Sequence, residues 1–162
     1  MCFILHLASK ARAARVQWNE KDRHVYVEDI HGNSDQVRAH FTLPEVAYVG
    51  SSIGCGCGFR YVSLQNGGWP EEWMIENGEC DPPENHLQDH QELHDLVTSL
   101  MSDEGCVELY GCWDGDEGEK AEHEETIPAS RLLEKDFWFR ERGLYRITHS
   151  EQVSGGNGGD RR

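Results

Sequence analysis

Lysine and arginine are missing from more than a third of the chain. Neither residue occurs between Arg60 and Lys120, while sixteen Asp and Glu lie inside that stretch. Acidic stretches of this kind repel phosphate backbones and anionic membrane surfaces, because their potential extends over a Debye length of about 10 Å. We therefore expect no nucleic-acid and no membrane partner, and the acidic face favours a protein partner. The sequence leaves the oligomeric state open.

Long apolar runs are also absent. No stretch approaches the ~20 apolar residues that span a bilayer, and the opening "MCFILHLASK" has no preceding basic region and no small-residue cleavage site. These absences predict a cytoplasmic protein, in which thiols stay reduced. Metal ligation or thiol chemistry then explains the six cysteines better than a disulfide framework does: Cys2, Cys55, Cys57, Cys80, Cys106 and Cys112.

Length and composition predict one folded domain. A chain of 162 residues fits a single domain, and although its hydrophobic fraction of 37% is below the usual ~45%, five Trp, five Tyr and five Phe can build a core. We expect a globular domain over residues 1–151. Residues 152–162 are rich in glycine and predict a flexible tail.

Hydrophobic periodicity predicts an α+β fold. The clearest helix is expected to follow Asp81, with Pro82 in its first turn, and to run to about residue 102, because Leu93, Val97 and Leu100 form one apolar stripe. A shorter helix is expected over residues 128–133. Alternating apolar residues predict strands at 2–7, 24–28, 46–50, 59–64 and 106–110, and a closing hairpin of 136–141 with 144–149. The expected domain is thus a mixed β-sheet with one main helix packed on it and a C-terminal β-hairpin.

The order of these elements brings two cysteine-containing segments together. The strand at 46–50, the main helix and the strand at 106–110 form a β-helix-β unit, and if the two strands are parallel, the loops that follow them lie at one edge of the sheet. Ligand sites favour that edge. The segments "GCGCGF" and "GCWDGDEGE" would then be neighbours, and Cys2 would join them if the first strand is antiparallel.

The segment "GSSIGCGCGFRYV" predicts a metal site, with zinc as the expected ion. Glycines around Cys55 and Cys57 remove steric bulk, so both sulfurs can face one centre, and Cys112 on the neighbouring loop is the expected third ligand. A fourth ligand could come from Cys106, Cys80 or a histidine. The Cys-x-Cys spacing differs from the usual C-x2-C to C-x4-C of zinc sites, so a tight turn of small residues is the alternative.

Histidines on the predicted main helix are weaker candidates for the same ion. His86 and His90 are four residues apart, which is a known geometry for two ligands of one metal. Histidines at the edge of an apolar stripe that only form hydrogen bonds give the same pattern.

A cysteine-dependent enzyme is a second hypothesis. Removal of Met1 would leave Cys2 at the N-terminus, where its own α-amino group can activate the thiol, and a redox thiol is a further variant. Asp114, directly after Trp113, could orient a ligand or act as a base, although capping a turn is its commoner role. The rest of the segment up to Glu125 departs from a calcium loop and predicts a solvated, mobile acidic loop. A third hypothesis is an interaction or housekeeping domain with structural cysteines.

Four blocks of the sequence carry a resemblance. "GCGCGF", "ELYGCWDGDE" and "FWFRERGLYRI", together with the start "MCFILHLAS", resemble a family of uncharacterised bacterial proteins of about this length. The resemblance implies a bacterial cytosolic protein. It adds no catalytic residue, because no activity is known for that family.

Overall fold

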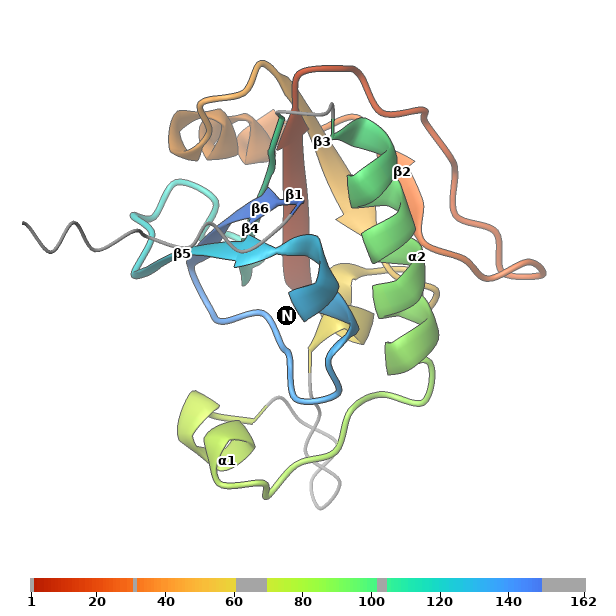
Figure 1. The fold of residues 1–162 in the computed structure, drawn as a ribbon, viewed down its shortest axis with the longest axis vertical. Coiled ribbons are helices and arrows are strands. Elements are labelled where there is room, and N and C mark those ends of the chain that lie inside the picture. Colours follow the sequence, from red (N-terminus) through yellow and green to blue (C-terminus); the bar gives the residue numbers. More distant parts are fainter. Residues whose placement is uncertain (1, 31, 61–69, 102–104, 150–162) are drawn as a thin grey trace, which may run out of the picture.

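Six strands form one mixed sheet in the order β2-β3-β1-β4-β6-β5, with helix α2 packed along one face (Figure 1). This computed structural model describes residues 2–30, 32–60, 70–101 and 105–149. The elements along the chain are β1 (Phe3–Ser9), β2 (Tyr26–Glu28), the 3-10 helix η1 (Gly32–His40), β3 (Glu45–Gly50), the 3-10 helix η2 (Gly56–Phe59), α1 (Glu72–Glu76), α2 (His86–Leu100), β4 (Val107–Trp113), β5 (His123–Pro128), the 3-10 helix η3 (Ala129–Leu133) and β6 (Gly143–Thr148). The predicted α+β fold is confirmed.

Strand β1 lies between β3 and β4 and determines where the carboxyl ends of these two strands lie. It is antiparallel to both β3 and β4, with Leu5 opposite Val49 on one side and Gly111 on the other. Since both neighbours run against β1, they run parallel to each other, and their carboxyl ends meet the amino end of β1. The predicted convergence at one sheet edge is therefore confirmed, and the backbone N–H of Asp114 donates to the carbonyl of Cys2 at 2.9 Å.

The two faces of β1 serve two cores. Phe3, Leu5 and Leu7 are fully buried in the main core, together with Leu93 and Val97 of α2. Fully burying such side chains contributes roughly 1.5–3 kcal/mol each. The alternate residues of β1 point to the other face, where Ala8 belongs to a smaller cluster with buried side chains of η1, β3 and β4, namely Val37, Val46, Tyr110 and Cys112.

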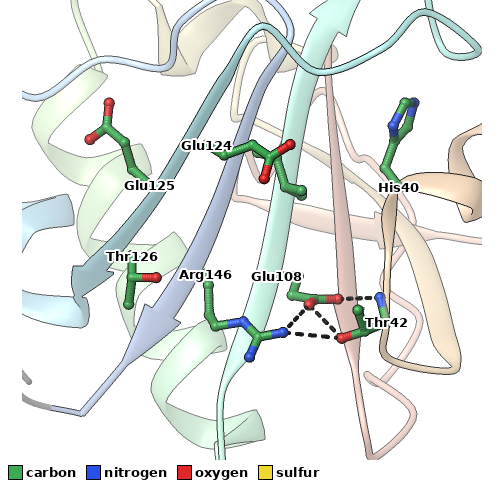
Figure 2. A pocket seen from close by; sticks show the side chains of 8 residues that line it. His40, Thr42, Glu108, Glu124, Glu125, Thr126 and Arg146 are labelled. Atoms are coloured by element: carbon green, nitrogen blue, oxygen red, sulfur yellow. Dashed lines mark hydrogen bonds and ion pairs between the residues drawn. The ribbon is translucent and has the colours of Figure 1, made fainter.

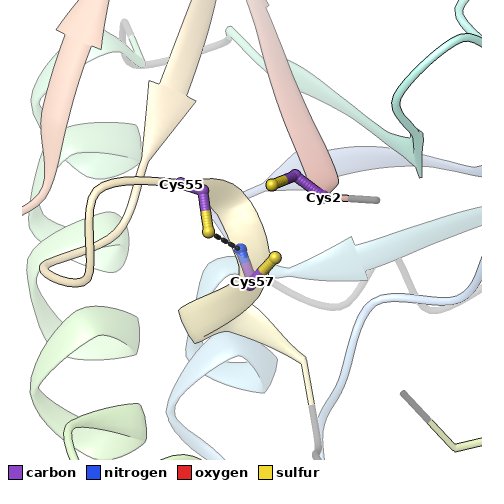
Figure 3. Close-up of side chains that lie close together, drawn as sticks. All are labelled: Cys2, Cys55 and Cys57. Atoms are coloured by element: carbon purple, nitrogen blue, oxygen red, sulfur yellow. Dashed lines mark hydrogen bonds between the residues drawn. The ribbon is translucent and has the colours of Figure 1, made fainter. Parts of the chain in front are cut away.

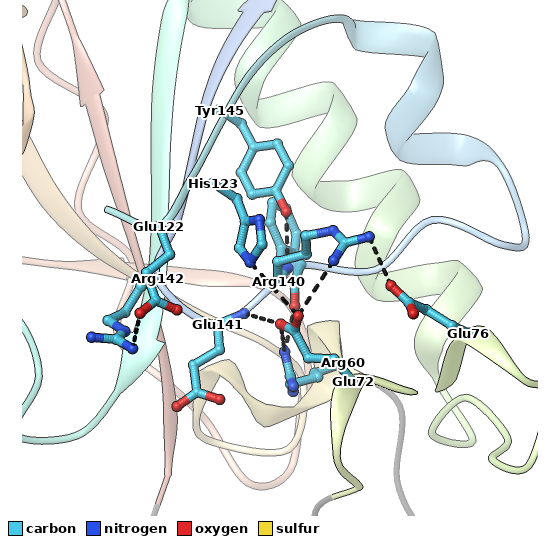
Figure 4. A network of polar contacts seen from close by, with 10 residues as sticks. Arg60, Glu72, Glu76, Glu122, His123, Arg140, Glu141, Arg142 and Tyr145 are labelled. Atoms are coloured by element: carbon cyan, nitrogen blue, oxygen red, sulfur yellow. Dashed lines mark hydrogen bonds and ion pairs between the residues drawn. The ribbon is translucent and has the colours of Figure 1, made fainter. Parts of the chain in front are cut away.

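The predicted C-terminal hairpin is wrong. Residues 136–141 form no strand, and β6 pairs antiparallel with β4 and parallel with β5. Backbone groups that a hairpin would pair instead form hydrogen bonds with side chains. Arg60 Nη1 donates to the Phe139 carbonyl at 2.7 Å, and the Glu141 N–H donates to Glu72 Oε1 at 2.8 Å. The Arg140 N–H similarly donates to the Tyr145 hydroxyl at 2.8 Å (Figure 4).

Several predicted boundaries also change. Helix α2 begins at His86 rather than after Asp81, because Pro83 disfavours helical backbone at Pro82. The expected strand at 59–64 starts at Phe59, which instead ends η2, and residues 61–64 lie outside the described residues, as does the tail 152–162. The predicted helix at 128–133 is the 3-10 helix η3. Within the described residues, no helix has the length and apolar character needed to cross a membrane.

Candidate metal centre

Three cysteine sulfurs converge at the end of the sheet where β1 begins and where β3 and β4 end. The Sγ atoms of Cys2, Cys55 and Cys57 all lie within 4.8 Å of one another. Figure 3 shows the loop with Cys55 and Cys57 packed against the start of β1, with Cys2 just before the strand. Two thiolates on one zinc ion lie about 3.8 Å apart when each Zn–S bond is about 2.3 Å, so small side-chain movements bring all three sulfurs to one ion.

The alternating glycines allow this close packing. Gly54 has a φ of +89°, which L side chains rarely adopt. A Cβ on Gly56 would lie 2.6 Å from the Phe3 carbonyl oxygen, and one on Gly58 would lie 2.2 Å from Ser51 Oγ. The loop therefore reaches the backbone of β1 because Gly56 has no side chain, and Gly58 leaves room for Ser51 inside the loop.

Backbone N–H groups point at two of the sulfurs. The Phe3 N–H donates to Cys57 Sγ at 3.2 Å, and the Cys57 N–H donates to Cys55 Sγ at 3.4 Å. Such hydrogen bonds favour the charged form of a sulfur. The hydrogen bond from the Cys57 thiol lowers the pKa of Cys55 to about 6, and the same bond, followed by burial, raises the pKa of Cys57. One proton thus stays on Cys57, while Cys55 is a thiolate near neutral pH.

Helix α2 holds residues 51–59, the cysteine loop, through a buried carboxylate. Asp89 is fully buried, and its two oxygens accept the Ser52 N–H at 2.9 Å and the Ser52 hydroxyl at 3.1 Å. The Ser51 hydroxyl donates to the Cys55 carbonyl at 2.7 Å and accepts the Gly58 N–H at 3.1 Å. The loop is therefore fixed from the helix side, with its polar groups paired.

A buried arginine fixes the other end of the loop. Arg60 is 1% exposed, and its guanidinium lies 5.3–5.4 Å from the ring centres of Phe3, Trp113 and Trp138. Arginine over an aromatic face is attracted by the negative ring surface. Figure 4 shows the same guanidinium beside Glu72, with an N–O distance of 3.9 Å. Phe3 and Trp113 flank the edge where the sulfurs meet, so Arg60 ties the loop to that edge.

A cavity of about 310 Å³ opens beside the sulfurs of this group. Cys2 and Cys55 form part of its wall, and the other lining residues come from β1, β3 and the segments after β2 and β4: Ile4, His6, Glu28, Asp29, Ile30, Ser34, Tyr48 and Asp114. His6 is 1% exposed, and burial lowers its pKa to about 4, so its ring is neutral. Asp114, predicted to face a ligand, lies at this cavity.

Cys112 is not a member of the sulfur group. It stands opposite Ile4 in the pairing of β1 with β4, and it is fully buried with Tyr110 in the smaller cluster on the other face of the sheet from Phe3. Cys112 lies inside the paired part of β4, whereas Cys2 precedes β1 and the other two cysteines follow β3. The third sulfur beside Cys55 and Cys57 therefore belongs to Cys2, which was predicted as a catalytic residue, and not to Cys112, which was predicted as the third ligand.

The weaker ligand candidates lie elsewhere. Cys106 directly precedes β4, at the end opposite the sulfurs, and Cys80 is a buried residue of the segment that connects α1 to α2. His86 and His90 are each 2% exposed, with ring centres 4.1 Å apart, and His90 Nδ1 donates to the Leu132 carbonyl at 2.9 Å. They are interior side chains rather than edge residues. In the described part of the chain, no other group of three potential ligands converges.

The acidic segment after Asp114 is more ordered than predicted. Glu117 is 4% exposed and accepts the Ser34 hydroxyl at 3.0 Å and the Gly115 N–H at 2.9 Å. The segment then continues into β5 from His123, so Glu117 and the start of β5 differ from the expected loop, whereas Asp114, Glu119 and Glu122 are exposed as expected. Strand β5 borders a groove of about 600 Å³ that Glu108 and Arg146 also line (Figure 2).

Comparisons with protein-family models, with curated proteins and with solved structures give no match for this chain.

Proposed function

We propose that this protein binds a thiophilic metal ion, zinc in the first place, through the thiolates of Cys2, Cys55 and Cys57. The convergence of the three sulfurs within 4.8 Å carries the proposal. Thiolates prefer zinc, copper(I) and iron–sulfur clusters to hard cations, and zinc accepts the geometry that its ligands offer. The N–H groups that point at two of the sulfurs would hold them in place and stabilise their charge.

Three protein ligands leave one zinc position open. Structural zinc sites are closed by four protein ligands, whereas sites that act on a bound molecule have three ligands and an exchangeable fourth position. The cavity beside Cys2 and Cys55 gives such a position access to solvent and small molecules. This supports a centre that accepts an exogenous ligand over a purely structural one.

Elemental analysis of protein purified without chelator tests the proposal. We expect about one equivalent of zinc per chain, and Cys2→Ser, Cys55→Ser and Cys57→Ser should each reduce zinc retention on dialysis against a chelator. Cys112→Ser and Cys106→Ser are the matched controls and should retain zinc. Metal-free parent protein that also fails to take up added zinc would overturn the proposal, and loss of zinc from Cys112→Ser alone would overturn the ligand set.

Cysteine-dependent catalysis is the second candidate function. The favouring observation is that Cys2 and Cys55 both line the cavity, together with Asp114. The variant with Cys2 as nucleophile requires removal of Met1, which intact-mass measurement decides. Metal-free protein in which Cys2 is alkylated much faster than Cys106 favours this candidate, whereas equal, slow alkylation of Cys2 and Cys106 contradicts it. Failure of both functions leaves an interaction domain.

A further inference from the structure

The cavity beside Cys2 and Cys55 has more space than the metal proposal uses. Its volume is about 310 Å³, whereas one water molecule occupies about 30 Å³ of the liquid. An ion held by the three sulfurs would border the cavity, because two of the three cysteines form part of its wall. The remaining space fits a small organic molecule in contact with the ion.

His6 forms part of the cavity wall beside such a molecule. Its side chain is 1% exposed, it lines the cavity, and its buried Nδ1 has no hydrogen-bond partner among the described residues. The ring lies edge-on to Tyr48, another wall residue, with 6.1 Å between ring centres.

The charges around the cavity favour a cation. Glu28 and Asp114 come from different segments and reach the same wall, and the described lining residues include no lysine or arginine. Asp29 also lines the cavity, but it already accepts a hydrogen bond from Arg15 at 2.7 Å. The field from Glu28 and Asp114 therefore attracts a positive group and repels a carboxylate of similar size.

We infer that the cavity binds a small organic thiol with a positively charged amino group, whose sulfur takes the fourth position on the metal ion. This inference rests on the proposed metal function. On binding, the thiol S–H bond breaks, the metal–sulfur bond forms, and the proton passes to solvent water, because coordination favours the thiolate. The ammonium group then lies near Glu28 and Asp114.

Cobalt(II)-loaded protein titrated with two probes of similar size tests the inference. Cysteamine carries the thiol and the amino group, whereas 3-mercaptopropionate carries the thiol and a carboxylate. A fourth thiolate increases the sulfur-to-cobalt charge-transfer absorption, so the spectrum reports each probe at the metal. We expect half-saturation with cysteamine at a concentration about tenfold or more below that for 3-mercaptopropionate, since a charge reversal beside two carboxylates changes affinity by this order.

Variants separate charge selection from metal binding. The double variant Glu28→Gln with Asp114→Asn should bind cobalt as the parent does and bring the two probes to within about twofold of each other. Equal binding of the two probes to the parent, or no spectral change with either, overturns the inference while the metal function stands. A parent that takes up no cobalt overturns both.

Discussion

At the scale of single residues, Gly56 is where the site depends most directly on an absent side chain. Its Cβ position is 2.6 Å from the Phe3 carbonyl oxygen and 3.0 Å from the Leu5 N–H nitrogen, both backbone atoms of the central strand. Strand β1 pairs with a neighbour on each side and cannot shift without breaking those pairs. A methyl group at residue 56 therefore has to move the cysteine loop away from Cys2.

Gly56→Ala should lower the free energy of unfolding by about 2–3 kcal/mol, the usual cost of overpacking a tight contact. It should also weaken zinc binding, because the loop carries two of the three sulfurs. Gly78→Ala is the control: its φ is +72° with no atom within 4 Å of the added Cβ, so only backbone strain of ~1 kcal/mol is expected. Urea unfolding and a zinc competition assay measure both effects, and equal zinc affinity in the two variants would contradict the packing argument.

Cys55 should be the thiol of the cluster that reacts at low pH in metal-free protein. The hydrogen bond from Cys57 lowers the pKa of Cys55 to about 6, and the thiolate is the reactive form, so the alkylation rate should rise with pH and level off above about 6. Mass spectrometry of iodoacetamide-treated protein at several pH values measures this midpoint. Cys57→Ala removes the donor and should move the midpoint towards the ordinary value of 9.0; a parent midpoint already near that value would refute the shared proton.

At the scale of elements, helix α2 contributes to the site through Asp89 rather than through its histidines. The carboxylate holds Ser52 by two hydrogen bonds, and the Cys55 carbonyl is held three residues further along the loop. Burial raises the pKa of Asp89, so the hydrogen bonds from Ser52 offset the cost of placing this group in the interior. Asp89 is thus a positioning residue for the sulfur group.

Asp89→Asn should weaken zinc binding by about 10- to 100-fold, as is usual for groups that orient a ligand from behind. The asparagine cannot accept both Ser52 donors, so the free energy of unfolding should also fall, by about 1–3 kcal/mol. Asp95→Asn, on the exposed side of the same helix, should change neither quantity measurably. Chelator competition and urea unfolding provide the two readouts, and unchanged zinc affinity in Asp89→Asn would show that the loop keeps its shape without the helix.

The sequence predicts the elements of this site better than its ligands. Apolar alternation locates β1, β3 and β4, and the β-helix-β order brings Cys2, the cysteine loop and Asp114 to one edge. It cannot tell that Cys112 packs against Val37 and Tyr110 instead of reaching the other sulfurs, because that packing joins segments far apart in the sequence. The predicted hairpin is wrong because of contacts between distant parts of the sequence. Arg60 and Glu72 form hydrogen bonds with backbone groups of residues 139 and 141, which a hairpin would have paired with another strand.

At the scale of the whole molecule, the two faces of the sheet differ in what covers them. Helix α2 and η3 pack on the main core, while η1 and the segments around it cover part of the other face. That second face carries the cavity at the sulfur end and the groove beside β5 at the far end. On this face, Glu108 of β4 links the segment after η1 to β6, because its carboxylate accepts hydrogen bonds from both.

Glu108 should make the stability of the protein depend on pH in the acid range. Its carboxylate is 3% exposed and accepts the Thr42 N–H at 2.8 Å, the Thr42 hydroxyl at 2.6 Å and Arg146 Nη2 at 2.9 Å (Figure 2). Burial alone would raise the pKa of Glu108, but these donors outweigh it and lower the pKa below its ordinary 4.5. The stabilisation is therefore complete above the unfolded pKa and is lost as pH falls through the folded pKa.

Glu108→Gln should consequently lower the free energy of unfolding at pH 7 by about 1.5–3 kcal/mol, because it replaces charge-assisted hydrogen bonds and leaves one donor unpaired. The difference from the parent should shrink as pH falls below 4.5, where the parent carboxylate also gains a proton. Glu124→Gln alters an exposed carboxylate of the same groove and should follow the parent at every pH. Urea unfolding from pH 3 to 7 measures all three proteins; a parent-to-Glu108→Gln difference that stays constant across this range would mean that Glu108 contributes by packing and not by its charge.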